Sequence, residues 1–185
     1  MRKKNGLGAG FTLIELLVVI TVIGLLASIL VPSIAGALKG SKKARAMAQI
    51  SDLNGAVKRY FAEYGKMPVP AGDNGGPDQA YTGSAQAAVL AILIGLDTTQ
   101  NPKQMVFLDL DPVTYGVKTV AEMNTLITGG GAYKDPWGND YGILMDLNFD
   151  ERISALGGFP EIRAKVAVYS GGEKNNTADP PYKTW

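Results

Sequence analysis

The stretch that decides the fold is residues 10–31, which read GFTLIELLVVITVIGLLASILV. The polar side chains among residues 11–31 are Thr12, Glu15, Thr21 and Ser28. At about 1.5 Å per residue, a helix of this length spans the roughly 30 Å hydrocarbon core of a bilayer. The sequence therefore predicts a membrane-spanning helix that carries one carboxylate, Glu15, near its start.

Glu15 is costly at this position and needs a partner. Insertion scales put a charged side chain within a membrane helix at about 2.5–3.5 kcal/mol, so such a residue indicates function. Cleavage of the bond between Gly10 and Phe11 would create a cationic α-amine on Phe11, one helical turn from Glu15. The sequence thus predicts a charge pair that forms only after a leader is removed.

The string GFTLIELLVVI behind a short basic leader resembles the prepilin signal of type IV pilins and type II secretion pseudopilins. The resemblance implies that a prepilin peptidase cuts after Gly10 and methylates the new N-terminal Phe11. It also implies that Glu15, fifth in the mature chain, guides the docking of each subunit against its neighbour in a filament.

Two other interpretations of the N-terminus stay open. A plain N-terminal anchor would not need Glu15 in its first turn. A secretory signal peptide would use the basic residues 2–4 and the A-x-A-like site at residues 35–37, which makes Leu38 the first mature residue. Against it, the apolar run is longer than the 7–15 residues of an ordinary signal, and it contains a charge.

The formal net charge of +1 hides a gradient along the chain. Residues 11–64 hold six basic and three acidic side chains, whereas residues 65–185 hold nine basic and fourteen acidic ones. This contrast predicts attraction between packed subunits. The alternative is that each set is simply solvated, because exposed ion pairs contribute only about 0–1 kcal/mol each.

The composition argues against several classes of function. The chain has no Cys and no His, so it lacks thiolate and imidazole ligands and the commonest general base. It shows no P-loop and no G-x-S-x-G string, and no basic patch with aromatic residues. We therefore expect no enzyme and no nucleic-acid binding.

The expected organisation is a leader (residues 1–10), an apolar helix (11–37), an amphipathic helix (38–64) and a globular head (65–185). Apolar residues recur at three- and four-residue steps from Ile50 to Tyr64 and predict the face that packs on the head. Pro32 and Gly24 soften the helix. The resemblance implies that the stretch between them loses helicity in an assembled filament, while a lone subunit keeps a gently curved helix.

Within the head, residues 65–128 should form an irregular αβ region and residues 129–185 a small sheet. The expected elements are a helix capped by Ser84, strands at 105–108, 141–145 and 165–170, a turn at 135–139 and an irregular tail at 179–182. Residues 119–128 are ambiguous. The sequence DPWGN at 135–139 is followed by a predicted strand and by VYS at 168–170, and this order resembles the major, G-type pseudopilin. We expect Trp137 to anchor the core.

One candidate ligand site follows a predicted strand. Asp146, Asn148 and Asp150 place three oxygen-bearing side chains at alternate positions, as a calcium loop requires. An EF-hand is rejected because Glu151 stands where that loop needs glycine. The resemblance to G-type pseudopilins implies a looser calcium site, with Glu151 or backbone carbonyls completing the shell. The alternative is a polar turn whose side chains bond nearby amides.

The sequence thus predicts an α+β protein of pilin-like lollipop form, with a long N-terminal transmembrane and filament helix packed on a small C-terminal antiparallel sheet. The resemblance implies a structural pseudopilus subunit of a type II secretion system. Its partners would be its own copies, prepilin peptidase, an assembly platform and minor pseudopilins. Its location would be the bacterial inner membrane, with the head in the periplasm. The alternatives are a type IV pilin and a secreted or anchored binding protein.

Overall fold

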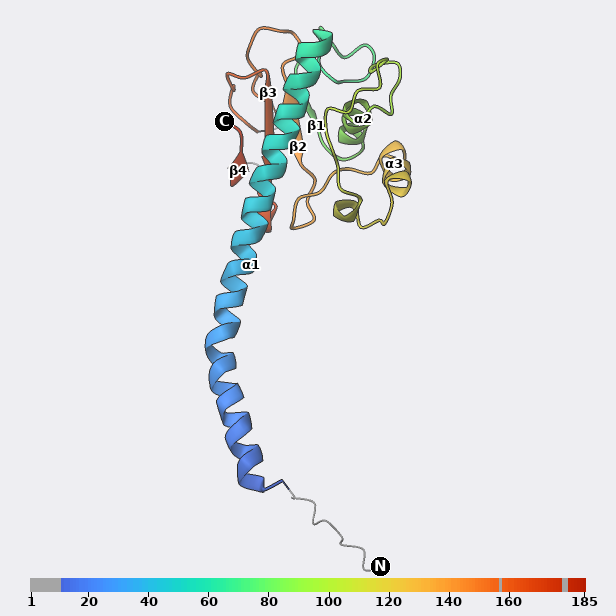
Figure 1. Ribbon diagram of the computed structural model, residues 1–185. Coiled ribbons are helices and arrows are strands. Elements are labelled where there is room, and N and C mark those ends of the chain that lie inside the picture. The colour runs from blue at the N-terminus through green and yellow to red at the C-terminus, as the bar shows by residue number, and fades with distance from the viewer. Residues whose placement is uncertain (1–10, 157, 178–179) are drawn as a thin grey trace, which may run out of the picture. The chain divides into compact units, whose positions relative to one another are not determined.

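The computed structural model describes residues 11–156, 158–177 and 180–185. The chain divides into two compact units, Met1–Ser41 and Lys42–Trp185. The long helix α1 (Leu13–Tyr64) begins in the first unit and ends in the second (Figure 1). The expected apolar helix (11–37) and amphipathic helix (38–64) are one continuous helix in the structure, which begins two residues later than expected.

The described part of the first unit consists of exposed residues throughout. The helix that begins in it is long and apolar enough, by length and composition, to cross a membrane. Pro32 lies inside the helix, and a side chain added at Gly24 would meet no atom within 4 Å. Within the described residues of this unit, nothing covers the apolar surface.

The second unit is built on a four-stranded antiparallel sheet. Its strands are β1 (Gln79–Tyr81), β2 (Gly142–Met145), β3 (Val166–Ser170) and β4 (Tyr182–Lys183), in the order β1-β2-β3-β4. Leu144 of β2 lies opposite Ala167 of β3. The predicted strands at 141–145 and 165–170 are therefore confirmed as the central pair.

Alternate residues of the two central strands face two apolar clusters. Ile143 and Val168 belong to the larger cluster, which contains the buried α1 residues Ile50, Leu53, Val57 and Tyr60. Leu144 and Ala167 belong to the smaller cluster, with Ile153, Phe159 and Ile162. Because neighbouring residues of a strand point to opposite faces, both faces of the sheet are covered. The predicted stripe on α1 is thus confirmed as its packing face.

Short helices complete the second unit: α2 (Gly83–Leu93), η1 (Pro112–Tyr115), α3 (Val120–Thr128) and η2 (Gly172–Lys174). The ambiguity at residues 119–128 is resolved as helix, because Thr119 and Glu122 form a capping box. The prediction that Ser84 caps α2 was wrong. Thr82 is the N-cap residue, and its side chain makes no capping hydrogen bond.

Three further expectations were wrong. Residues 105–108 form no strand; instead the Phe107 amide bonds the Leu93 carbonyl at 2.8 Å and Arg59 bonds the Phe107 carbonyl at 2.6 Å. The expected irregular tail contains Tyr182, the first residue of β4. Trp137 is half-buried rather than a core residue, and its ring stacks on Tyr182 at a centroid distance of 5.3 Å.

Candidate functional site

The first turn of α1 holds Glu15 in a local hydrogen-bond network with Thr12. One Glu15 carboxylate oxygen accepts from the Thr12 backbone N–H at 2.9 Å and from the Thr12 hydroxyl at 2.7 Å. The Glu15 backbone N–H donates in return to the Thr12 hydroxyl at 3.3 Å. This reciprocal arrangement, three residues apart at a helix start, has the geometry of a capping box.

The neighbouring motif residues are exposed. Phe11 is 77% exposed and precedes the helix. Gly10 and the rest of the leader, residues 1–10, lie outside the described residues. Of the two residues at the predicted cleavage point, the structure therefore describes Phe11. Glu15 is exposed as well, and its carboxylate uses one of its two oxygens for Thr12. Among the described residues, no donor forms a hydrogen bond with the other oxygen, so a partner could reach it.

Sequence reasoning missed the role of Thr12. The string Thr12-Leu13-Ile14-Glu15 has the T-x-x-E form of a capping box directly before an apolar run, and this signal was present in the sequence. The network gives Glu15 a second explanation besides a charge partner, because capping satisfies free N–H groups of the first turn. The two explanations make different predictions for a neutral glutamine at this position.

The acidic loop after β2 is closed by its own hydrogen bonds. The Asp146 carboxylate accepts from the amides of Phe149 at 2.7 Å and Glu151 at 2.8 Å. Asn148 accepts from the Asp150 amide at 3.0 Å. Phe149 and Glu151 have φ values of 63° and 66°, so two residues of this tight turn lie in the left-handed region.

A second buried carboxylate, Asp78, ties this loop to the strand region. It accepts from the Ser154 amide at 2.7 Å and the Leu147 amide at 3.0 Å. Burial alone would raise the pKa of Asp78, but the hydrogen bonds from Ser154 and Leu147 bring this pKa below its ordinary value. Burial raises the pKa of Asp146, although the amides of Glu151 and Phe149 act in the opposite direction.

The candidate ligand oxygens are engaged by donors of the chain itself. The Asp146 and Asp150 oxygens accept from backbone amides, and the Glu151 carboxylate lies 3.6 Å from the Lys165 ammonium. In the described part of the chain, no three acidic side chains come together to hold a metal ion. The geometry matches the polar-turn alternative, and calcium binding stays a prediction.

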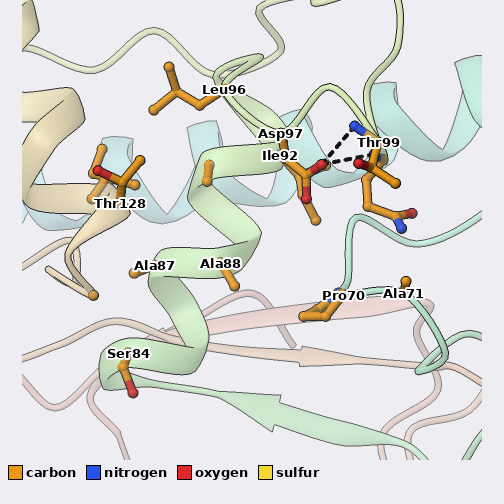
Figure 2. Close-up of a pocket in the computed structure, with 14 residues that line it drawn as sticks. Pro70, Ala71, Ser84, Ala87, Ala88, Ile92, Leu96, Asp97, Thr99 and Thr128 are labelled. Atoms are coloured by element: carbon orange, nitrogen blue, oxygen red, sulfur yellow. Dashed lines mark hydrogen bonds between the residues drawn. The ribbon is translucent and has the colours of Figure 1, made fainter.

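A groove of the second unit lies between α2, α3 and the loop at Pro70 (Figure 2). Its floor is lined by small apolar side chains, among them Ala87, Ala88 and Ala91. Asp97 is engaged by the amides of Thr99 at 2.9 Å and Gln100 at 3.0 Å, the contacts drawn dashed in the figure. The Asp97 carboxylate therefore stabilises the turn that follows α2.

Comparison with known proteins places the N-terminus in a defined class. Residues 8–31 match the model of the prokaryotic N-terminal methylation motif. This match covers the first turn of α1 with Thr12 and Glu15, together with most of the exposed apolar surface. The chain therefore carries a type IV pilin-like prepilin motif.

Curated proteins are similar to part of this chain. The type II secretion system core protein G of Pectobacterium carotovorum subsp. carotovorum is 36% identical over 59 residues, which are 32% of this chain and 38% of that protein. The protein of the same name from Klebsiella pneumoniae is 34% identical over 59 residues, 32% of this chain and 42% of that protein. A fimbrial protein of Eikenella corrodens is 39% identical over 59 residues, 32% of this chain and 39% of that protein.

These matches span about two fifths of the length of the curated relatives. No solved structure gives a significant match. The similarity to type II secretion system core protein G thus concerns about a third of this chain, and the fold of the remainder is known from its own structure.

Proposed function

We propose that this chain is a structural subunit of the pseudopilus of a type II protein secretion system. The observation that carries the proposal is the exposed apolar segment of α1, which coincides with the matched methylation motif at residues 8–31. Among the described residues of its unit, this segment packs on nothing. Lipid before assembly, and neighbouring copies after it, would supply the missing cover.

Processing comes first in the proposed sequence of events. A prepilin peptidase removes residues 1–10 by cutting after Gly10 and methylates the amine of Phe11. Before assembly the segment holds the chain in the bacterial inner membrane, with residues 65–185 on the periplasmic side. The basic residues 2–4 favour this orientation, because positive charges near the first span stay in the cytoplasm.

Assembly then exchanges one set of contacts for another. In the uncut chain, the Glu15 carboxylate is held by Thr12. In the filament, this carboxylate pairs with the Phe11 amine of a neighbouring copy. The exchange is favourable because the cationic Phe11 amine replaces the neutral Thr12 donors beside the carboxylate, in a medium of low dielectric constant. An assembly platform and minor pseudopilins would guide the process.

A type IV pilin is the second candidate. The 39% identity over 59 residues to a fimbrial protein of Eikenella corrodens favours it. Both candidates predict the same polymer and differ in its destination, since a pilus reaches the cell surface and a pseudopilus stays periplasmic. The position of labelled fibres in intact cells separates them.

The test of the proposal is polymer formation that depends on the leader. Cells that produce the full chain with a prepilin peptidase and an assembly platform should yield fibres that pellet after shearing or lysis. A chain with Gly10→Ala should stay unprocessed and should yield none. Equal pelleting of both chains, or fibres from neither, would overturn the proposal.

A further inference from the structure

The second unit carries an apolar hollow of about 380 Å³ beside the last turns of α1 and the start of β3. Its floor is formed by the buried side chains of Val57, Met67 and Val166. The ring of Phe61, which lies 6.1 Å from the Phe149 ring, forms one wall. A concave apolar surface of this kind suits a small apolar side chain from another molecule.

The rim of this hollow is basic, although residues 65–185 as a whole are acidic. Lys58, Arg163 and Lys165 line it. The Lys165 ammonium lies 3.6 Å from the Glu151 carboxylate and 4.9 Å from the centroid of the Phe61 ring. Lys58 and Arg163 are exposed, and within the described ranges neither forms an ion pair. The rim therefore keeps two uncompensated positive charges.

A surface with the opposite character lies at residues 109–113, which we call the acidic tip. Leu110 is buried and anchors it, whereas Asp109 and Asp111 are exposed. Val113 is 72% exposed, the highest fraction among the large hydrophobic side chains described in this unit. The Asp111 carboxylate accepts from the Val113 amide at 3.0 Å, so the backbone of the tip is fixed.

Two cations of α1 bond groups on either side of the acidic tip. Arg45 donates to the Thr114 hydroxyl at 2.8 Å, and Arg59 donates to the Phe107 carbonyl at 2.6 Å. The tip itself holds two acidic side chains and no basic one. An exposed valine with flanking carboxylates complements an apolar hollow with a basic rim in both shape and charge.

The acidic tip of one molecule cannot fill its own hollow. Thr114 is bonded to Arg45, and Val57 is the residue of the hollow nearest to Arg45 along α1, so the two surfaces lie twelve residues apart on this helix. That separation corresponds to roughly 18 Å along the helix axis. A contact between them therefore joins two molecules and uses a different surface on each. Such a heterologous contact, repeated without closing, generates a helical filament.

We infer that Val113 of one copy enters the basic hollow of the next, with Asp109 and Asp111 facing Lys58 and Arg163. The inference rests on the proposed function, because it matters only when copies assemble in line. The Val113 contact would act in addition to the contact made between copies by the apolar segment of α1. The Val113 contact involves only residues of the second unit.

Cysteine crosslinking in fibres tests the contact, since the natural chain has no cysteine. Full-length chains with Val113→Cys and with Ala164→Cys, a residue that lines the hollow, are produced together in the assembling cells. Oxidised fibres should contain a dimer of the two variants, and each variant alone should give none. Fibres from the mixture without that dimer would overturn the inference and leave the proposed function standing. An absence of fibres from the unmodified chain would overturn both.

A matched control and a charge exchange make the result specific. The exposed Lys174→Cys replaces Val113→Cys in the control mixture and should give no dimer.

Arg163→Asp should lower the pelleted fraction several-fold, and Arg163→Asp with Asp109→Arg in the same chain should restore it. Lys174→Glu should leave it unchanged. Full pelleting of the Arg163→Asp chain, or the absence of rescue by Asp109→Arg, would contradict the contact.

Discussion

The Glu15 carboxylate accepts two hydrogen bonds from Thr12, one from the backbone N–H at 2.9 Å and one from the hydroxyl at 2.7 Å. The same carboxylate is the group that we assign to pairing with the Phe11 amine of a neighbour. A cap and an intermolecular charge pair place different demands on this side chain. Capping needs an acceptor, whereas pairing with an amine needs a negative charge.

Glu15→Gln separates these two roles. Glutamine can accept the Thr12 bonds of a capping box, but it carries no charge. We therefore expect the variant to insert into the membrane and to lose its leader, yet to give no pelleted fibres. Thr12→Ala is the control: it should weaken the helix start by about 1 kcal/mol and leave fibres intact. Normal fibres from Glu15→Gln would show that capping is the main role of this glutamate.

A buried amide connects α1 to the head. The Gln49 side chain donates to the Tyr133 hydroxyl at 2.6 Å and accepts from the Tyr141 hydroxyl at 2.7 Å. Gln49→Ala leaves both hydroxyls without this partner, and each unsatisfied buried group costs about 1–3 kcal/mol. We expect a clearly lower melting temperature for the full chain in detergent. The exposed Ser51→Ala, two residues further on, should change it little; equal melting temperatures would contradict the role of this network.

Alkaline pH should destabilise the second unit. An unfolded tyrosine ionises near pH 10, whereas burial raises the pKa of Tyr133 to about 12 and that of Tyr60 to about 12. Between these values the unfolded chain releases protons that the native chain keeps, so stability is unchanged below pH 10 and falls from about pH 10 to 12. Melting curves from pH 8 to 11 check this, and a constant melting temperature over that range would contradict it.

Gly142 and Tyr169 are cross-strand partners in intimate contact. A methyl group added at Gly142 would overlap the Tyr169 ring, so Gly142→Ala must displace that ring from the smaller cluster. We expect a loss of about 1–3 kcal/mol in the free energy of unfolding, the usual cost of overpacking. Gly55→Ala on α1 is the control, since its methyl would meet only the flexible Arg59 side chain. Denaturant unfolding compares the two, and similar stabilities would refute the steric argument.

Calcium binding by the loop at 146–151 is decided by titration. If an ion replaces the amide donors of this loop, millimolar calcium should raise the melting temperature of the full chain. Saturation at a hundred times the dissociation constant would stabilise it by about 2.7 kcal/mol. Asp150→Ala should abolish the shift, whereas the exposed Asp109→Ala should keep it. No shift in the unmodified chain would end the calcium prediction.

The elements that could be predicted from the sequence share one property: their signals are long and repetitive. The apolar run of α1 and its later stripe at Ile50 to Tyr60 extend over many turns, and β2 and β3 are apolar runs bounded by glycine and turn residues. The prepilin motif could also be recognised in the sequence, because it is long, its residues follow a defined order, and it lies directly behind a short basic leader.

The elements that were missed depend on contacts far away in the chain. β1 and β4 have three and two residues, too short for a periodic signal, and they exist because β2 and β3 offer free edges. Residues 105–108 have an apolar composition typical of a strand, but their polar groups are used by Leu93 and Arg59 instead. At the candidate site, the capping partner Thr12 was visible in the sequence, whereas the closure of the acidic loop by amides was not.

The most direct test of the central claim is the mass of the N-terminal peptide of the native chain in pelleted fibres. We predict a peptide that begins at Phe11 and carries one extra methyl group on its amine. A peptide from these fibres that begins at Met1 or at Leu38, or one that begins at an unmethylated Phe11, would contradict the account.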